Sequence, residues 1–495
     1  MALSIEEMAV FCKKKGFVFP NAEIYGGLAG FFDYGPLGVE LKNNIINSLW
    51  ASFVSSREDV VGIDGAIITN PKVWKASGHV DCFEDVLLEC TKCKQRFRAD
   101  HLIEETLHIE AEGLSAEDLN KLIKENKIVC PSCKSPLSEA KQFNLMFETN
   151  VGPVSGNISY LRPETAQLIF ANFKMVHDVS RVKLPFGIAQ VGKAFRNEIS
   201  PRDFLFRGRE FEQFEIEFFI HPDKLNDCEF IGEVENLKVN IFADGKESSM
   251  VIKDIVKKKM MTSWHAYWAA SFYKWFLDHD ISPDSLRLRQ HRKDELAHYA
   301  RACFDIEYKF PSGWKEIHGN ADRKDFDLTQ HALFSKKDLS IFDEETQKKV
   351  IPHVVEPSQG IGRALLAFMY SAYDDDKKRG NIVLHLAPAL APTKAGIFPL
   401  LGNKQELVTI AREIFSELKK YFPVMYDRSG SVGRRYARQD EIGTPYCITV
   451  DFDSLTQKDV TIRDRESTDQ KRVKISELRD LLRKLLNREL AFKDI

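Results

Sequence analysis

The spacing of apolar residues predicts amphipathic helices in four parts of the chain. After Gly35-Pro36, apolar side chains recur at every fourth position from Leu41 to Phe53. Proline suits the first turn of this helix because its missing N–H would have no partner there. The same period predicts helices through residues 365–370, 410–418 and 478–486.

Short runs rich in β-branched and aromatic residues predict strands at 66–69, 186–195, 210–220, 382–384, 395–401 and 447–452. Strand 210–220 alternates, so successive side chains lie on opposite faces of the sheet. One face carries Phe214, Ile216 and Phe218, and the other carries Phe211, Gln213, Glu215 and Glu217. The second face is either a solvated sheet surface or a binding platform.

A domain boundary is predicted near residues 381–392, where an apolar strand is followed by two Ala-Pro steps. Beyond it strands and helices alternate, which predicts an α/β unit over residues 381–495, attached to a body of residues 1–380. Between Cys90 and Cys133 the chain is polar and charged. We expect residues 86–140 to form a module inserted into the body.

The composition is typical of a folded protein without disulfides. The 495 residues are 43% hydrophobic and 29% charged, and no run of about 18 apolar residues predicts a membrane span. Residues 1–7 lack the features of a secretory signal, and the nine cysteines form no disulfide framework, so we expect a cytoplasmic protein. Residues 381–495 hold 20 Lys and Arg against 16 Asp and Glu, although the whole chain has a net charge of −3. The basic tail permits a nucleic-acid partner without requiring one.

Two Cys-x-x-Cys pairs predict a structural metal site. Cys90 and Cys93 precede Cys130 and Cys133, with 36 residues between the pairs. Four thiolates suit tetrahedral zinc and leave it no open position, so this metal would be structural. The alternative is a set of buried thiols without a metal, but two such pairs rarely coincide by chance.

Arginine and aromatic side chains gather around the polar face of strand 210–220. Residues 187–194 approach a P-loop pattern, but the last residue is alanine instead of Ser or Thr and no helix follows, so we reject that interpretation. Arg196, Arg207 and Arg209 bracket Phe211. Phosphate-binding cations beside a stacking ring suit a nucleotide.

A second candidate site lies in residues 354–363, which predict a strand, a tight glycine turn and the start of a helix. Ser358 either caps this helix or contacts a ligand. Gly360 and Gly362 would let a ligand approach the backbone, where Arg363 would meet it.

Together these pieces resemble the three signature motifs of class II aminoacyl-tRNA synthetases. The pieces are the helix after Pro36 with the strand that ends at Pro71, residues 195–198 with 207–211, and the turn at 360–363. Neither the HIGH-type nor the KMSKS-type signature of class I enzymes occurs. The resemblance implies an α+β fold with an antiparallel-sheet catalytic domain, a zinc-ribbon-like insertion and a C-terminal α/β anticodon-binding domain.

The resemblance narrows to glycyl-tRNA synthetases of the homodimeric type and covers residues 17 to 486, nearly the whole chain. The segments that carry it are 162–167, 286–291, 295–299, 313–316, 321–323, 356–358 and 430–445. It implies that glycine is activated with ATP to glycyl-adenylate and then transferred to the 3′ end of tRNA(Gly). It also implies a homodimer that needs no membrane, with the helix after Pro36 in the dimer interface.

The same resemblance implies the residues of the site. ATP with Mg²⁺ would contact Arg196, Asn197, Glu198, Phe206, Arg207, Gly208, Arg209, Glu210, Phe211, Glu316, Ile317, Gly360, Ile361, Gly362 and Arg363, with Arg196 and Arg363 as catalytic residues. Glycine would contact Arg98, Glu164, Phe211, Glu212, Gln213, Phe214, Glu215, Glu356, Pro357, Ser358, Gln359 and Gly360. RNA would contact Arg434, Arg435, Tyr436 and Arg438, although such a run taken alone is typical of a surface loop.

Two alternatives remain at this point. One is a threonyl, prolyl or histidyl relative with the same type of tail. The carboxylates Glu164, Glu215 and Glu356 and the segment around Trp314 disfavour it. The other is a non-catalytic paralogue, which could have lost the phosphate-binding arginines, whereas this chain keeps them.

Overall fold

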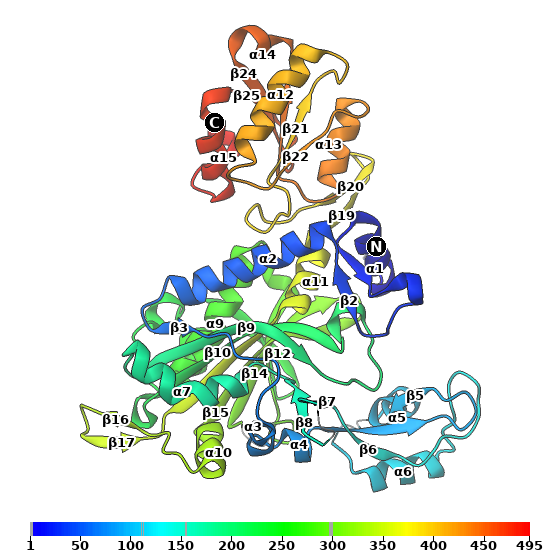
Figure 1. Ribbon diagram of the computed structural model, residues 1–495, viewed down its shortest axis with the longest axis vertical. Helices are drawn as coiled ribbons and strands as arrows, with labels where there is room; N and C mark the ends of the chain where they lie inside the picture. Colours follow the sequence, from blue (N-terminus) through cyan, green and yellow to red (C-terminus); the bar gives the residue numbers. More distant parts are fainter. Residues whose placement is uncertain (1–2, 110, 112, 154–155, 297–299) are drawn as a thin grey trace.

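The computed structural model describes residues 3–109, 111, 113–153, 156–296 and 300–495. Residues 297–299, part of the segment 295–299 that carries the family resemblance, lie outside the described residues. Figure 1 shows a large body, a small lobe at its lower right and a C-terminal unit above it. Helix α2 (Pro36–Trp50) lies along the top of the body, on the side that faces the C-terminal unit.

The body is built on a nine-stranded, mainly antiparallel sheet in the order β12-β11-β13-β14-β15-β18-β10-β9-β3. Only the pairs β11–β13 and β3–β9 are parallel. The strands are β3 (Val60–Gly62), β9 (Phe186–Phe195), β10 (Glu210–Ile220), β11 (Lys238–Ala243), β12 (Lys246–Val251), β13 (Leu286–Gln290), β14 (Ala302–Phe310), β15 (Gly313–Lys324) and β18 (His353–Gly360). The predicted strands 186–195 and 210–220 are confirmed, and they pair with each other.

Helices cover both faces of this sheet. On one face, α9 (Ser263–Asp278) and α11 (Ile361–Ala372) join α2 in a core that includes Phe214 and Phe218. On the other face, α7 (Ala166–Ser180) packs against Phe219. The remaining helices of the body are α1 (Ile5–Lys15), α3 (Pro71–Ala76), α4 (His79–Cys82), α8 (Ile252–Lys257) and α10 (Phe326–Ser335). The helices predicted after Pro36 and through 365–370 are confirmed.

The strand predicted at residues 66–69 is wrong. This segment is irregular: Ile68 forms an isolated bridge with Leu161, and the Thr69 carbonyl accepts a hydrogen bond from the Ser159 hydroxyl at 2.7 Å. Asn70-Pro71 starts helix α3 instead of ending a strand, because the Asn70 side chain accepts a hydrogen bond from the Lys72 N–H at 3.0 Å and Pro71 occupies the first turn.

The tight glycine turn predicted at 360–363 is also wrong. Strand β18 continues through Gly360, whose backbone is extended (φ −73°, ψ 114°), and helix α11 begins at the next residue. Gly360 is therefore the N-terminal flanking residue of the helix, so Ser358 does not cap it. Ser358 remains within the sheet, where it pairs with Glu215.

The small lobe has its own sheet and core. Its strands β4 (Glu84–Glu89), β5 (Arg96–Arg98) and β6 (Lys141–Asn144) form a sheet in the order β5-β4-β6. Helices α5 (Ala99–Leu107) and α6 (Ala116–Glu125) cover it with a separate cluster that includes Leu88, Ile103 and Leu119.

The C-terminal unit is an α/β sandwich with a core of its own. Its sheet has the order β22-β21-β23-β24-β25 and is partly parallel. The strands are β21 (Ala395–Pro399), β22 (Val424–Tyr426), β23 (Tyr446–Val450), β24 (Asp459–Asp464) and β25 (Gln470–Lys474), and the helices are α12 (Gln405–Leu418), α13 (Val432–Asp440), α14 (Phe452–Gln457) and α15 (Leu478–Leu486). The predicted helices through 410–418 and 478–486 are confirmed, whereas the predicted strands 395–401 and 447–452 each end two residues early.

Four hairpin pairs complete the structure. They are β1 (Val18–Pro20) with β2 (Phe32–Tyr34), β7 (Phe147–Asn150) with β8 (Ile158–Leu161), β16 (Ile341–Asp343) with β17 (Lys348–Val350), and β19 (Tyr373–Asp376) with β20 (Asn381–Leu384). The last pair confirms the predicted strand 382–384 and leads into the C-terminal unit. Throughout the described part of the chain, every helix is too short or too polar to cross a bilayer.

Candidate active site

The register of the central sheet aligns polar side chains that are far apart in the sequence. Asp305 on β14 pairs with Gly319 on β15, Gly319 pairs with Ser358 on β18, and Ser358 pairs with Glu215 on β10. Directly paired residues in an antiparallel sheet point to the same face. This row therefore brings residues from four strands to one surface, and the small Gly319 leaves space in its middle.

A cavity of about 310 Å³ opens on this surface. Its walls include most of the residues that the family resemblance implies for the two small substrates. These are Glu164, Arg196, Glu198, Phe206, Arg207, Gly208, Phe211, Glu212, Gln213, Glu215, Glu316, Glu356, Ser358, Gly360, Gly362 and Arg363.

The other implied substrate residues lie behind the cavity wall or beside it. They are Arg98, Asn197, Arg209, Glu210, Phe214, Ile317, Pro357, Gln359 and Ile361. Phe214 belongs to the apolar core, and the buried Gln359 side chain donates to the Ile317 carbonyl at 2.8 Å. Arg98 reaches the cavity only indirectly: it pairs with Asp85 at 3.3 Å, and Asp85 in turn contacts Arg207, which lines the cavity.

The guanidinium groups at the cavity lie against aromatic rings. The Arg196 Cζ atom is 5.2 Å from the centre of the Phe211 ring, and the Arg363 Cζ atom is 4.5 Å from that of Phe206. Arg363 is also held by Glu316 at 2.8 Å. Within the described residues Arg196 makes no ion pair, and its Nε donates to the Pro163 carbonyl at 3.1 Å. Its terminal nitrogens are therefore available to an anion.

Three buried carboxylates also line the cavity, each in a different environment. Glu164 lies 3.3 Å from the His79 imidazole and accepts a hydrogen bond from Gln167 at 3.0 Å. Burial opposes its ionisation, but His79 and Arg323 lower the pKa of Glu164 below its ordinary value. Glu164 is therefore ionised in the folded protein.

Glu215 is surrounded by neutral donors. One oxygen accepts from the Thr165 N–H at 2.9 Å and from the Thr165 hydroxyl, and the other accepts from Ser358 and Gln213, both at 2.8 Å. Burial raises the pKa of Glu215. The polar face of β10 is thus not a solvated surface, because Glu215 is only 2% exposed.

Glu356 is the third carboxylate. Its Oε2 accepts from Arg323 at 2.8 Å, and Arg323 also makes a two-bonded contact with Asp327 at 2.7 and 2.8 Å. Its Oε1 accepts no hydrogen bond from the described residues and faces the cavity. Burial, opposed by Arg323 and reinforced by Glu215 and Glu164, raises the pKa of Glu356 to about 8.

Sequence reasoning missed a group of side chains at the cavity edge. His291 Nε2 is 2.5 Å from the Asp305 carboxylate, and the Cys303 thiol is 3.7 Å from it. The three offer ligand atoms within 4.8 Å of one another, a donor set that suits a divalent cation. The resemblance segment 286–291 contained His291, but its meeting with Asp305 depends on the pairing of β13 with β14.

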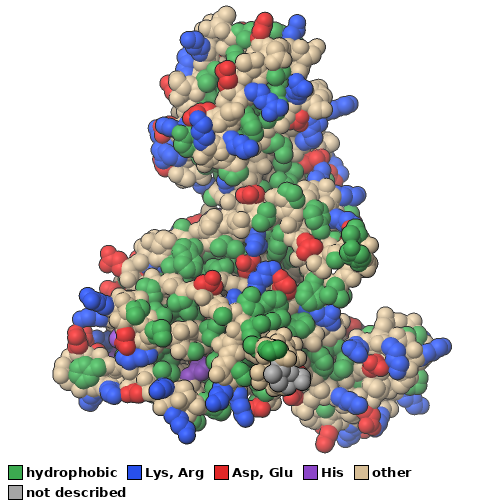
Figure 2. All heavy atoms as spheres, in the orientation of Figure 1, with side chains coloured by type: hydrophobic (Ala, Val, Ile, Leu, Met, Phe, Trp, Pro, Cys, Tyr) green, Lys and Arg blue, Asp and Glu red, His purple; other side chains and the backbone are tan. Residues whose placement is uncertain are grey.

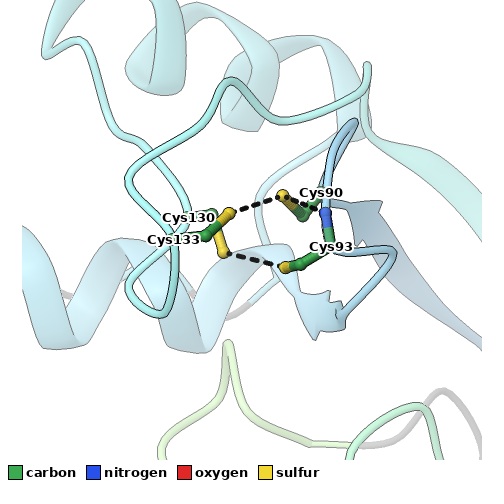
Figure 3. A group of neighbouring side chains, drawn as sticks. All are labelled: Cys90, Cys93, Cys130 and Cys133. Atoms are coloured by element: carbon green, nitrogen blue, oxygen red, sulfur yellow. Dashed lines mark hydrogen bonds between the residues drawn. The ribbon is translucent and has the colours of Figure 1, made fainter.

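The two cysteine pairs meet in the lobe (Figure 3). Cys90 Sγ is 3.4 Å from Cys133 Sγ, and Cys93 Sγ is 3.7 Å from Cys130 Sγ. Four thiolates around tetrahedral zinc would lie about 3.8 Å apart, so these residues fit such an ion. Hydrogen bonds from Ser135 lower the pKa of the Cys133 thiol to about 6, which favours a thiolate.

The four residues implied for RNA contact form part of helix α13 rather than a loop. Arg435 is buried and donates to the Pro399 and Leu400 carbonyls at 2.6 and 3.0 Å. Tyr436 is half-buried, with its hydroxyl 2.7 Å from that of Thr449. Arg434 and Arg438 are exposed. Lys and Arg side chains are also spread over other parts of this unit in Figure 2.

Two family matches define the class of this protein. Residues 155–372 match the family described as "tRNA synthetase class II core domain (G, H, P, S and T)", and residues 394–485 match "Anticodon binding domain". The fold also resembles the structure of prolyl-tRNA synthetase from Cryptosporidium parvum complexed with L-proline and AMP, with a TM-score of 0.57 and 14% identity over 98% of this chain and 79% of that one. The sheet, its cavity and the C-terminal unit are those of a class II aminoacyl-tRNA synthetase.

Curated relatives narrow the class further. The glycine–tRNA ligase of Geobacillus thermodenitrificans is 47% identical over 98% of both chains. That of Clostridium kluyveri is 46% identical over 97% of this chain and 98% of its own, and that of Caldanaerobacter subterraneus is 45% identical over 99% of both. The chain belongs to the glycine–tRNA ligase family. The family, the α+β class II fold and an ATP-dependent aminoacyl-tRNA ligase activity are thus confirmed.

Proposed function

We propose that the cavity binds glycine and ATP, forms glycyl-adenylate with release of pyrophosphate, and then passes glycine to the 3′ end of tRNA(Gly). The observation that carries this proposal is that one cavity combines guanidinium groups packed on aromatic rings, here called the cationic half, with three buried carboxylates, here called the acidic half. A nucleoside triphosphate suits the first half, and an ammonium group suits the second.

In the cationic half, Phe211 stacks on adenine, Glu198 lies on the adenine side, and Arg196 holds the α-phosphate. Arg207 and Arg363 hold the outer phosphates, and Mg²⁺ arrives with ATP. The availability of the Arg196 terminal nitrogens beside the Phe211 ring supports this arrangement. The glycine carboxylate attacks the α-phosphorus in line and is already anionic, so no general base is needed. The cations stabilise the charge of the transition state.

In the acidic half, Glu356 and Glu164 bind the glycine ammonium, with Glu215 and Ser358 beside them. Glycine has no side chain to grip, so its affinity comes from its charged ends. The support is the Glu356 Oε1 atom, which faces the cavity and accepts no hydrogen bond from the described residues. Larger amino acids are excluded by shape, because they clash with the walls instead of merely losing contacts.

The rest of the chain serves this reaction. Residues 1–380 are the catalytic domain, residues 86–140 are an insertion that holds structural zinc through its four cysteines, and residues 381–495 bind the anticodon. The exposed Arg434 and Arg438 of α13 are the side chains that meet RNA, while Arg435 and Tyr436 fix this helix to its sheet. The nine cysteines, all unpaired, suit the cytoplasm.

The enzyme works as a homodimer whose interface includes α2 and the segment that reaches Pro71. A groove of about 510 Å³ beside Pro71 supports this. Its walls carry Ile68, Val151 and Ile158, each 42–49% exposed. A second copy that covers this groove would remove these aliphatic side chains from water.

The deciding experiment is ATP–pyrophosphate exchange by the purified protein with each of several amino acids. Exchange that depends on glycine and is weak with alanine, serine and proline is the expected result. Exchange driven by proline or threonine, or none with any amino acid, would refute the proposed substrate.

A further inference from the structure

The lobe is joined to the body at the wall of the active site. Strand β4 begins directly after Phe83, strand β6 ends at Asn144, and these two strands pair through Glu84 with Asn144 and Asp85 with Phe143. We call Phe83, Asp85, Asn144 and Leu145 the lobe base. Both crossings of the chain between the body and the lobe therefore pass through one small region.

The lobe base contacts Arg196 and the residue after it. The Phe83 ring centre lies 5.5 Å from the Arg196 Cζ atom, while the Phe211 ring of β10 lies 5.2 Å from the same atom. The guanidinium thus touches one ring from the lobe base and one from the sheet. The Asn197 N–H donates to the Leu145 carbonyl at 2.8 Å, which fixes the backbone beside Arg196.

The lobe base also contacts the second phosphate-binding arginine. The Asp85 carboxylate lies 3.4 Å from Arg207 and 3.3 Å from Arg98. Arg207 is held on its other side by Glu198 at 2.7 Å. Asp85 and Glu198 therefore set the direction of the Arg207 guanidinium between them.

The same region reaches the acidic half of the cavity. The Asn144 side chain donates to the His79 and Val80 carbonyls at 3.1 and 2.9 Å. This fixes helix α4, from which the His79 ring reaches Glu164 at 3.3 Å. One short stretch of backbone pairing thus supports side chains in both halves of the active site.

We propose that the lobe base is part of the active site and that Phe83 and Asp85 are positioning residues for Arg196 and Arg207. Arg196 has a long flexible side chain and no ion pair among the described residues, so its direction before ATP binds depends on Pro163 and the two rings. If the lobe had no role in the active site, its base would need neither the Phe83 ring against Arg196 nor the Asp85 carboxylate against Arg207. The inference rests on the proposed roles of these arginines in ATP binding.

The test compares four variants in glycine-dependent ATP–pyrophosphate exchange. Phe83→Leu keeps apolar volume but removes the ring, Phe83→Tyr restores a ring, and Asp85→Asn removes only a charge. Phe97→Leu is the matched control, because Phe97 packs in the lobe core and not against the arginines. We expect Phe83→Leu to raise the ATP KM about three- to tenfold, in line with the loss of one cation–π contact. Asp85→Asn should act in the same direction.

The glycine KM of Asp85→Asn should change less than twofold, and Phe83→Tyr should return the ATP KM to near the wild-type value. Unchanged ATP KM values in both Phe83→Leu and Asp85→Asn would overturn the inference. So would an equal effect of Phe97→Leu, because the lobe would then act only through its overall stability. Wild-type protein without glycine-dependent exchange would instead refute the proposed function, so the two failures are distinct.

Discussion

Replacement of Glu356 by glutamine tests how the site recognises its amino acid. The change keeps the size of the side chain and removes its charge. Arg323 keeps its two hydrogen bonds to Asp327, so the substitution does not leave that guanidinium without a partner. The substitution should therefore weaken mainly the binding of the glycine ammonium to the Oε1 atom, which faces the cavity.

The expected magnitude follows from the worth of one hydrogen bond to a charged group. Such a bond contributes about 1.5–3 kcal/mol, so the glycine KM should rise about 10- to 150-fold. The ATP KM should change little, because the guanidinium that Glu356 contacts is that of Arg323, which is not among the arginines proposed to hold the phosphates. Glycine-dependent ATP–pyrophosphate exchange at saturating ATP measures the first value, and the same assay at saturating glycine measures the second.

Glu217 provides the matched control on the neighbouring strand. It is 0% exposed, and neither of its carboxyl oxygens has a hydrogen-bond partner among the described residues. Burial raises the pKa of Glu217 well above its ordinary value, which favours the neutral acid. Glu217→Gln keeps the size of this side chain at a position outside the cavity and should leave the glycine KM within about twofold of wild type.

The pH profile adds an independent readout. Because the pKa of Glu356 is raised to about 8, the ligand-free enzyme keeps this proton at pH 7, whereas a bound ammonium favours its loss. Glycine should therefore bind more tightly as the pH rises from 6 to 8, and the improvement should level off above that. The slope should disappear in Glu356→Gln. Equal weakening of glycine and ATP, or an equal effect of Glu217→Gln, would refute the assignment of the ammonium to Glu356.

Three further predictions concern the ATP half, the metal and the assembly. Arg196→Ala should lower the exchange rate about 10²- to 10³-fold with an unchanged melting temperature, since it removes one preorganised charge contact, and near-normal exchange would contradict this. Metal analysis under reducing conditions should find about one zinc per chain, and protein without zinc would contradict the proposed metal site. A chelator should speed hydrogen exchange in the lobe but not in the central sheet. Sedimentation should find a dimer at micromolar concentration that Ile158→Asp converts to monomer, and an active wild-type monomer would contradict it.

Much of the local structure could be predicted from the sequence. The bounds of β9 and β10, the helix after Pro36 and the helices of the C-terminal unit follow from apolar spacing that involves only near neighbours. Each Cys-x-x-Cys turn brings two thiols together by itself, whereas the meeting of the two pairs depends on the fold of the lobe. The wrong predictions at 66–69 and 360–363 arose where a local signal was compatible with two structures. The pair Asn70-Pro71 is compatible both with the end of a strand and with the start of a helix. A glycine is likewise compatible with an extended strand as well as with a turn.

The tertiary structure alone decided which polar residues became buried and which met. The alternation along β10 is the same for a solvated face as for the floor of a cavity, and Glu215 is buried because Thr165, before helix α7, and Ser358 of β18 pack against it. Arg435 is the type of residue that contacts RNA, but its position on helix α13 points it toward the buried carbonyl of Pro399. Asp305, Gly319, Ser358 and Glu215 form one row only because four strands pair in one register. A residue's own neighbours in the chain largely decide its secondary structure. Burial and register depend on more distant segments, such as the paired residues Glu215 and Ser358, which are 143 residues apart, so they are decided only when the whole sheet is assembled.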